Sequence, residues 1–401
     1  LFLSSGFLVG IIFFILGLGT LLPWNFFMTA SMYFNNRLNV SERSNETETT
    51  RKEYYFNNWM TLLSQLPLLL FTLLNSFLYQ WISEKMRIAG SLVFILILFI
   101  LTAVLVKIPM EEDRFFSVTM ATIWFINSFS AVLQGSLFGL VGLLPQRYSA
   151  VFMSGQGLAG TFAALAMIFA ITSEADSESA ALGYFITPCV GTLVTLFSYM
   201  LLPKLVSECV FRCNPVQFLI QLNLRLISGV CVCVCIWVMA FCVTFVFTVT
   251  LSVFPAVTVD VKTVYGGKWE RYFIPVLCFL FFNLMDFIGR SVTLVSKWPS
   301  KDSRLFPLLV VCRVVFVPLL MMCNVQERHI MPVLFSNDVM FAAIMVFFSV
   351  SSGYFVCLSM TYAPQLVEPK DGETAGALMA FFLALGLSLG AALSFPLRFL
   401  V

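Results

Sequence analysis

The chain has 401 residues, of which 60% are hydrophobic and 11% are charged, and its mean hydropathy is +0.94. An ordinary soluble domain is about 45–50% apolar and about 25% charged, so this composition excludes a soluble globular protein. The formal net charge is +2 without a basic block, which excludes nucleic acid as a partner. The single histidine, His329, excludes a histidine-rich metal site, and we expect no metal or cofactor.

Long apolar runs recur along the chain and predict an all-α integral membrane protein, because a spanning helix needs about 20 mostly apolar residues. The first run is too long for a cleaved signal peptide. Since the chain begins with Leu1 rather than Met, we expect further residues before it. Eleven transmembrane helices are expected, at about 7–32, 57–81, 88–107, 115–141, 150–173, 181–202, 230–256, 272–295, 306–323, 335–361 and 374–400.

The first span is interrupted by Pro23, Trp24 and Asn25. Proline permits a kink and frees a backbone carbonyl, while tryptophan supplies a flat face and asparagine a polar edge. Phe254 and Pro255 repeat the interruption late in the seventh span. A pair of Pro-interrupted helices in the two halves indicates a transporter site. A tryptophan in a membrane protein is, however, as often an interfacial anchor.

The polar loop at 33–55 contains two glycosylation sequons, at Asn39 and Asn45, and these place the loop outside the cell. The N-terminus is then cytoplasmic, and eleven crossings leave the C-terminus extracellular. Lysine and arginine counts hardly distinguish the two sides. A cytoplasmic segment at 203–229 separates an N-terminal bundle, 1–202, from a C-terminal bundle, 230–401. That segment is either an amphipathic surface helix or an ordinary linker.

Polar side chains within the spans have two interpretations each. Gln134 either forms a helix–helix hydrogen bond or reads a heterocycle edge, since an amide both donates and accepts.

The glycines at 155–160 match a dinucleotide fingerprint, but no strand precedes them, so they predict close helix packing. Alternate cysteines at 231–235 do not face each other on a helix and predict membrane packing rather than metal binding.

Asp286 and Arg290 place two charges in the eighth span, four residues apart and therefore on one helix face. A charge at the bilayer centre costs at least about 2.5–3.5 kcal/mol. The two residues are either a self-neutralising pair or the polar floor of a solvent-filled cavity. We favour the floor, because the arginine keeps donors free and the carboxylate keeps acceptors free; Asn283 extends this face. For Arg313, a packing or interface role is as probable as a functional one.

Several stretches resemble the equilibrative nucleoside transporter family. They lie at 16–25, 134–139, 153–160, 286–290 and 373–377. The resemblance covers nearly the whole chain, and residues 58–67 are most similar to the second vertebrate subtype, which also carries nucleobases. It implies eleven helices in a 6+5 major-facilitator-like arrangement. The sequons favour the plasma membrane, and we expect a monomer that is not an enzyme. The resemblance also implies sodium-independent facilitated diffusion of nucleosides and nucleobases by alternating access.

The resemblance implies roles for individual residues. Asp286 and Arg290 hold the ribose hydroxyls, and Gln134 reads the base. Arg87 and Glu373 match the cytoplasmic ends of spans three and eleven, and we expect them to pair and close the inward gate. The expected pocket also includes Trp24, Leu21, Leu387, Asn25, Gln65 and Ser130, and the expected extracellular gate includes Met28, Phe254, Pro255, Phe279 and Asn283. The residues at 65 and 130 resemble the second subtype and predict weaker binding of thio-purine inhibitors.

Three features depart from the family pattern. The central cytoplasmic loop is nearly absent, Ser352 stands where these subtypes usually show asparagine, and Pro396 interrupts the last span. The alternative within transport is a proton-coupled carrier of an acidic compartment that uses Asp286. A channel or receptor is the alternative from another class. A membrane enzyme is disfavoured because no catalytic set can be assembled from the sequence.

Overall fold

A computed structural model describes residues 2–30, 34, 56–78, 82–173, 177–210, 229–326 and 330–401. These residues are largely helical, and their β-structure consists of two isolated bridges, Val261–Val325 and Cys323–Phe335. Asn39, Asn45, His329 and most of the segment at 203–229 lie outside the described residues.

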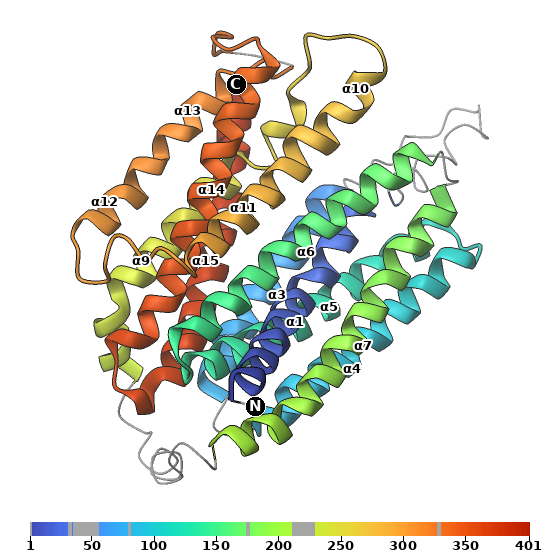
Figure 1. Ribbon diagram of the computed structural model, residues 1–401. Coiled ribbons are helices and arrows are strands. Elements are labelled where there is room, and N and C mark those ends of the chain that lie inside the picture. Colours follow the sequence, from blue (N-terminus) through green and yellow to red (C-terminus); the bar gives the residue numbers. More distant parts are fainter. Residues whose placement is uncertain are drawn as a thin grey trace.

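Six long helices form the first half of the described chain and lie side by side (Figure 1). Helix α1 packs against α6 and α7, α4 packs against α5 and α7, and α3 packs against α5. The six helices are α1 (Phe2–Thr29), α3 (Phe56–Leu78), α4 (Glu84–Lys107), α5 (Glu112–Gly142), α6 (Gln146–Thr172) and α7 (Ser177–Val210).

The second half consists of helices with more interruptions. Helix α9 packs against α14 and α15, and α11 packs against α14. The α-helices are α9 (Gly229–Val253), α10 (Lys268–Phe273), α11 (Phe281–Val292), α12 (Leu305–Cys312), α13 (Phe316–Met321), α14 (Asp338–Tyr362) and α15 (Gly372–Leu400). The shorter elements are η2 (Thr258–Asp260), η3 (Ile274–Leu280), η4 (Arg313–Val315), η5 (Ala363–Leu366) and η6 (Pro369–Asp371).

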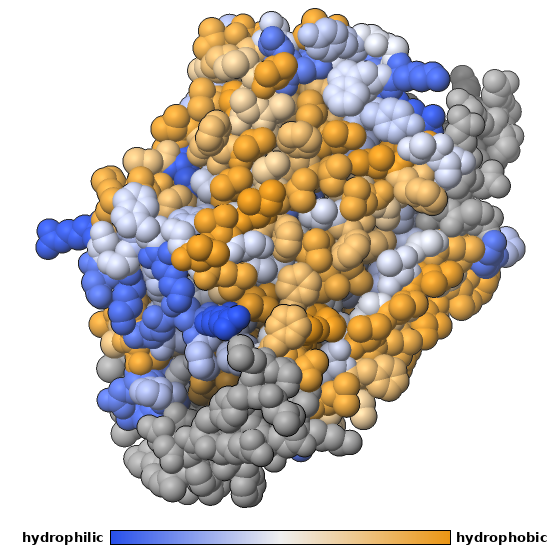
Figure 2. All heavy atoms as spheres, viewed as in Figure 1, coloured by the Kyte–Doolittle hydropathy of each residue, from blue (hydrophilic) through white to orange (hydrophobic). Residues whose placement is uncertain are grey.

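The described residues contain ten helices that are long and apolar enough to cross a membrane. The ninth expected span corresponds to a shorter apolar helix, Leu305–Met321, which the 3-10 turn η4 interrupts. Large apolar side chains are exposed on these helices, for example Phe169 and Phe197. Apolar side chains cover much of the visible face, whereas hydrophilic ones gather toward its ends (Figure 2). This distribution is that of a multi-pass membrane protein.

Proline has different consequences in the spans. Pro23 lies inside the continuous helix α1, whereas α9 ends at Val253, just before Pro255. The eighth span is not one regular helix, because η3 between α10 and α11 is π-helical and contains Pro275. Proline cannot donate to the carbonyl four residues earlier, and a local change of hydrogen-bond register accommodates it. The π-helical segment η3 leads directly into α11, which carries Asp286 and Arg290.

The glycine-rich stretches pack helices closely, as the sequence predicts. A Cβ on Gly155 would overlap the carbonyl of Phe14 in α1. A Cβ on Gly386 in α15 would lie 2.5 Å from the carbonyl of Thr244 in α9. The packing interpretation of the glycines at 155–160 is therefore confirmed, and the glycines of the last span pack in the same way.

Candidate functional site

A cavity of about 120 Å³ lies where helices of both halves meet. Helices α1 and α6 contribute from the first half, and α9, α11 and α14 from the second. Its lining residues are Leu21, Asn25, Gln156, Gly157, Gly160, Phe247, Thr250, Leu251, Phe254, Phe282, Asn283, Asp286, Arg290 and Ser352.

The ion pair of Asp286 and Arg290 forms the polar part of this cavity. The arginine Nε lies 2.7 Å from the carboxylate Oδ2, and each residue is only 6% exposed. The arginine Nη1 also points at the carbonyl of Met153 and at Oε1 of Gln156, at 3.4 and 3.5 Å. Within the described residues, Asp286 Oδ1 and Arg290 Nη2 form no hydrogen bond. One charged acceptor and one charged donor therefore stay available to a ligand.

Gln156 belongs to this polar group, although the sequence analysis interpreted its glycine-rich stretch only as packing. Its side chain is 2% exposed, and its Nε2 donates to Thr20 Oγ1 at 3.0 Å. The threonine hydroxyl in turn donates to the carbonyl of Gly17. The glutamine thus links α1 to Arg290 on α11. The signal in the sequence is an amide between two glycines, where a membrane helix has room for a neighbouring polar group.

Aromatic rings form a wall of the cavity. Phe254 and Phe282 stack with ring centroids 3.9 Å apart and an interplanar angle of 13°, and Phe279 meets Phe254 edge-on at 5.9 Å. Asn283 donates to the carbonyl of Phe279 at 2.9 Å. A Cβ at Gly160 would overlap the Asn283 amide. A flat apolar surface and a charged hydrogen-bonding group therefore line the same space.

Of the expected site residues, the structure brings Leu21, Asn25, Phe254, Asn283, Asp286 and Arg290 to this cavity. The others lie outside its lining: Trp24, Met28, Gln65, Arg87, Ser130, Gln134, Pro255, Phe279, Glu373 and Leu387. Trp24, Met28 and Leu387 pack against the main apolar core.

Two amides of the expected pocket lie on the neighbouring helices: Gln65 on α3, and Gln134, the expected base-reading residue, on α5. Gln65 has a buried Oε1 without a partner, and Gln134 is 7% exposed and makes no hydrogen bond within the described residues. Their part in binding stays a prediction.

Arg87 and Glu373 meet, as expected, at the end of the molecule where α4 and α15 begin, called here the Arg87 end. Their Nη2 and Oε1 atoms lie 3.4 Å apart, and the side chains are 6% and 13% exposed. The arginine also donates to Asn75 Oδ1 and Ser136 Oγ at 3.4 and 3.3 Å. A Cβ on Gly142 in α5 would overlap the carbonyl of Gly372. Helices of the two halves are therefore packed tightly at this end.

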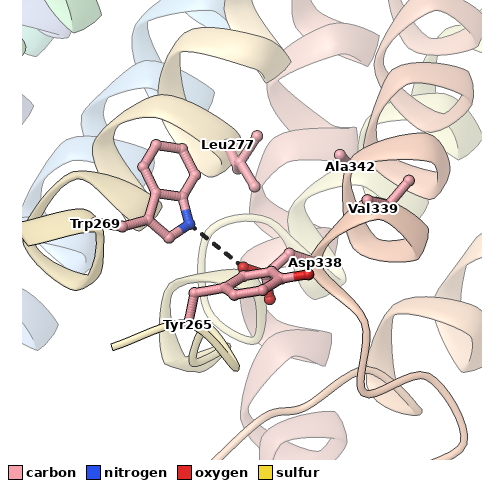
Figure 3. Close-up of a pocket in the computed structure, with 6 residues that line it drawn as sticks. All are labelled: Tyr265, Trp269, Leu277, Asp338, Val339 and Ala342. Atoms are coloured by element: carbon pink, nitrogen blue, oxygen red, sulfur yellow. Dashed lines mark hydrogen bonds between the residues drawn. The ribbon is translucent and has the colours of Figure 1, made fainter. Parts of the chain in front are cut away.

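A larger cavity, of about 420 Å³, lies between α10, η3 and the start of α14. Figure 3 shows Trp269 and Tyr265 beside Asp338, whose Oδ2 accepts from the indole Nε1 at 3.3 Å. The carboxylate also accepts from the Thr263 hydroxyl and from the backbone N–H of Val264. These bonds tie the loop before α10 to α14. The smaller central cavity, with its unused charged groups, is the better candidate for solute binding.

Comparison with solved structures defines the class of this fold. The proton:xylose symporter XylE, of the major facilitator superfamily, superposes with a TM-score of 0.68 at 12% sequence identity. The match covers 98% of this chain and 88% of the symporter. This chain therefore shares the all-helical, multi-pass fold of this major-facilitator symporter.

Sequence comparison identifies the family. The nucleoside transporter family model matches residues 120–212 and 219–399. Human equilibrative nucleoside transporter 2 is 51% identical, and human equilibrative nucleoside transporter 1 is 47% identical. Each match covers 98% of this chain and 97% of the relative. The chain belongs to the equilibrative nucleoside transporter family, whose members are named as transporters rather than enzymes.

Proposed function

We propose that this protein carries nucleosides across the plasma membrane by sodium-independent facilitated diffusion. The observation that supports this most is the unused acceptor of Asp286 beside the unused donor of Arg290, in a cavity with a phenylalanine wall. Vicinal ribose hydroxyls can donate to a carboxylate and accept from a guanidinium. A nucleoside is neutral overall, so its movement down a gradient needs no coupled ion. Nucleobases are proposed as further substrates.

The proposed cycle alternates between two states. A cavity of about 120 Å³ is small compared with ligand pockets of about 300–1,000 Å³, so the helices must separate to admit a nucleoside. We assign the cytoplasmic gate to Arg87 and Glu373 and the extracellular gate to Met28, Phe254, Pro255, Phe279 and Asn283. Base recognition is assigned to Gln134, with Trp24, Leu21, Leu387, Asn25, Gln65 and Ser130 around it. The transporter acts as a monomer with a cytoplasmic N-terminus and an extracellular C-terminus.

The proposal also concerns domain organisation. Six helices at 1–202 and five at 230–401 move against each other, and the short segment at 203–229 links them. The pattern of helix contacts supports this division, because α1, α4 and α7 make their most extensive contacts with other helices of the first half.

The test is uptake of radiolabelled uridine and hypoxanthine in transporter-null cells, with and without sodium. We expect saturable, sodium-independent uptake of both. Asp286→Asn and Arg290→Lys should each lower uptake at least about tenfold at equal surface expression, because charge-assisted hydrogen bonds contribute about 1.5–3 kcal/mol. Glu111→Gln is the matched control, since the Glu111 carboxylate is 72% exposed. Uptake that requires sodium, or rises steeply as the external pH falls, would contradict the proposal in favour of a coupled carrier.

A further inference from the structure

Arg313, whose role the sequence left open, is enclosed between α9 and α14 and is 2% exposed. Its Nη1 donates to the carbonyl of Val246 and its Nε to Ser351 Oγ, both at 3.1 Å. Its Nη2 donates to the carbonyl of Phe348 at 3.2 Å and to Thr250 Oγ1 at 3.1 Å. A guanidinium can only donate. Arg313 therefore dictates that each of these oxygens is an acceptor.

The Thr250 hydroxyl has its hydrogen-bonding capacity filled by its neighbours. It accepts from Arg313, and it donates its single proton to the carbonyl of Val246 at 2.7 Å. Its remaining contact is Ser352 Oγ at 3.3 Å. Because the threonine proton is already used at the shorter distance, the Ser352 hydroxyl is the donor in this contact.

Ser352 consequently presents only lone pairs to the central cavity. Its oxygen makes one hydrogen bond within the described residues, the bond to Thr250, and its residue lines the cavity with Asp286 and Arg290. The next residue, Gly353, lies so close to the backbone of Asp286 that a Cβ would overlap it. Ser352 is therefore on the side of the cavity where the ion pair lies.

We propose that Ser352 is a specificity-determining residue that accepts a hydrogen bond from a ribose hydroxyl of the substrate. Arg313 acts as a positioning residue, since it fixes the direction of the serine proton through Thr250. An asparagine side chain would offer both a donor and an acceptor at this position, whereas the oriented serine offers an acceptor alone. The carrier therefore favours a ribonucleoside over the analogue that lacks this hydroxyl. This inference rests on the proposed transport of nucleosides.

The experiment compares uptake efficiency for uridine, 2′-deoxyuridine and 3′-deoxyuridine in transporter-null cells, at equal surface expression. Wild type should favour uridine over one of the two analogues by at least about fivefold, because that analogue loses a neutral hydrogen bond to Ser352 in addition to any contact with the ion pair. Ser352→Ala should lower this ratio about fivefold by lowering uridine uptake alone. Ser352→Thr, which keeps a hydroxyl, should preserve the ratio. Thr250→Val should lower it, because the serine proton is then free to turn toward the cavity.

Ser351→Ala is the matched control, because Ser351 also bonds Arg313 but does not line the cavity. Its uridine-to-deoxyuridine ratio should equal that of wild type. A wild type that does not distinguish the three nucleosides would overturn the inference. So would a Ser352→Ala variant that keeps the wild-type ratio, or one whose uptake of all three falls in parallel. Absence of any nucleoside uptake by wild-type protein at the surface would instead contradict the proposed function itself.

Discussion

Gly160 of α6 shows how one missing side chain shapes the central cavity. Asn283 lies directly opposite on α11, and its Nδ2 is held by the carbonyl of Phe279 at 2.9 Å. A Cβ at Gly160 would overlap the amide, so the asparagine keeps its position only while residue 160 is glycine. The two helices belong to different halves, and the fit therefore couples helix packing to the shape of the site.

Gly160→Ala is expected to lower uridine uptake about tenfold while the protein still reaches the surface. The added methyl group displaces the Asn283 amide and breaks its bond to Phe279, which narrows the cavity. Gly90→Ala on α4 is the control, because a Cβ there meets nothing within 4 Å. It should transport normally and be slightly more stable, since glycine in a helix costs roughly 0.5–1 kcal/mol relative to alanine. Equal uptake by the two variants would show that the position of Asn283 does not matter.

The sequence predicted some site residues and missed others for a physical reason. Asp286 and Arg290 were predictable because two charges in an apolar span are expensive and their spacing puts them on one face. Gln156 was missed because its partners, Thr20 and Arg290, come from α1 and α11. The glycines beside Gln156 indicate room for a neighbouring polar group, but the local sequence does not show which group of another helix lies there.

At the scale of elements, the positions of the spans followed from the sequence, but their internal breaks did not. Bilayer thickness fixes the length of an apolar run, and each expected span corresponds to apolar helix in the structure. The π-helical turn η3 and the 3-10 turn η4 are different. The first depends on how the chain accommodates Pro275, and the second lies at Arg313, whose guanidinium bonds α9 and α14. Such breaks need tertiary contacts that an apolar run does not encode.

The contact of α4 with α15 at the Arg87 end can be tested by reversing charges. Arg87→Glu and Glu373→Arg should each lower uridine uptake severalfold, because each places like charges in a nearly buried contact. The double variant should recover part of the uptake, with a coupling of about 0.5–3 kcal/mol. Recovery should be incomplete, since the native arginine also donates to Asn75 and Ser136.

The exposed pair of Glu111 and Arg114 provides the control for this cycle. Its atoms lie 3.6 Å apart, and both side chains are more than two-thirds exposed. Exposed pairs contribute about 0–1 kcal/mol, so its single and double reversals should leave uptake unchanged. If the losses of uptake caused by Arg87→Glu and Glu373→Arg simply add in the double variant, their contact has no part in transport.

At the scale of the whole molecule, the apolar cores are distributed unevenly between the two ends. The main cluster combines residues of the first half with residues of the second, such as Val356 and Met379. A separate cluster contains only residues of the second half, such as Phe254 and Phe341. A third contains Leu22 and residues of α1 and α6. The halves thus share a core toward the Arg87 end and have separate smaller cores elsewhere. This arrangement permits the two halves to separate at one end while they stay in contact at the Arg87 end.

If the halves separate at the Arg87 end during transport, a covalent cross-link between the two halves at that end must stop the transport cycle. Gln146 of α6 and Thr361 of α14 are hydrogen-bonded across the halves, with Nε2 and Oγ1 3.4 Å apart. A short, reducible bifunctional thiol reagent applied to Gln146→Cys/Thr361→Cys should abolish uridine uptake, and a reductant should restore it. Wild-type protein treated with the same reagent is the control for its reaction with the native cysteines.

The control cross-link lies within one half. Tyr199 of α7 donates to Glu84 Oε1 of α4 at 3.3 Å, so Glu84→Cys/Tyr199→Cys can be linked by the same reagent. Helices that move as one body should tolerate this link, and uptake after linking should equal uptake before it. Persistent uptake through a fully linked α6–α14 pair would mean that the halves stay together at this end, and that solute passes by a route that the Arg87 contact does not control.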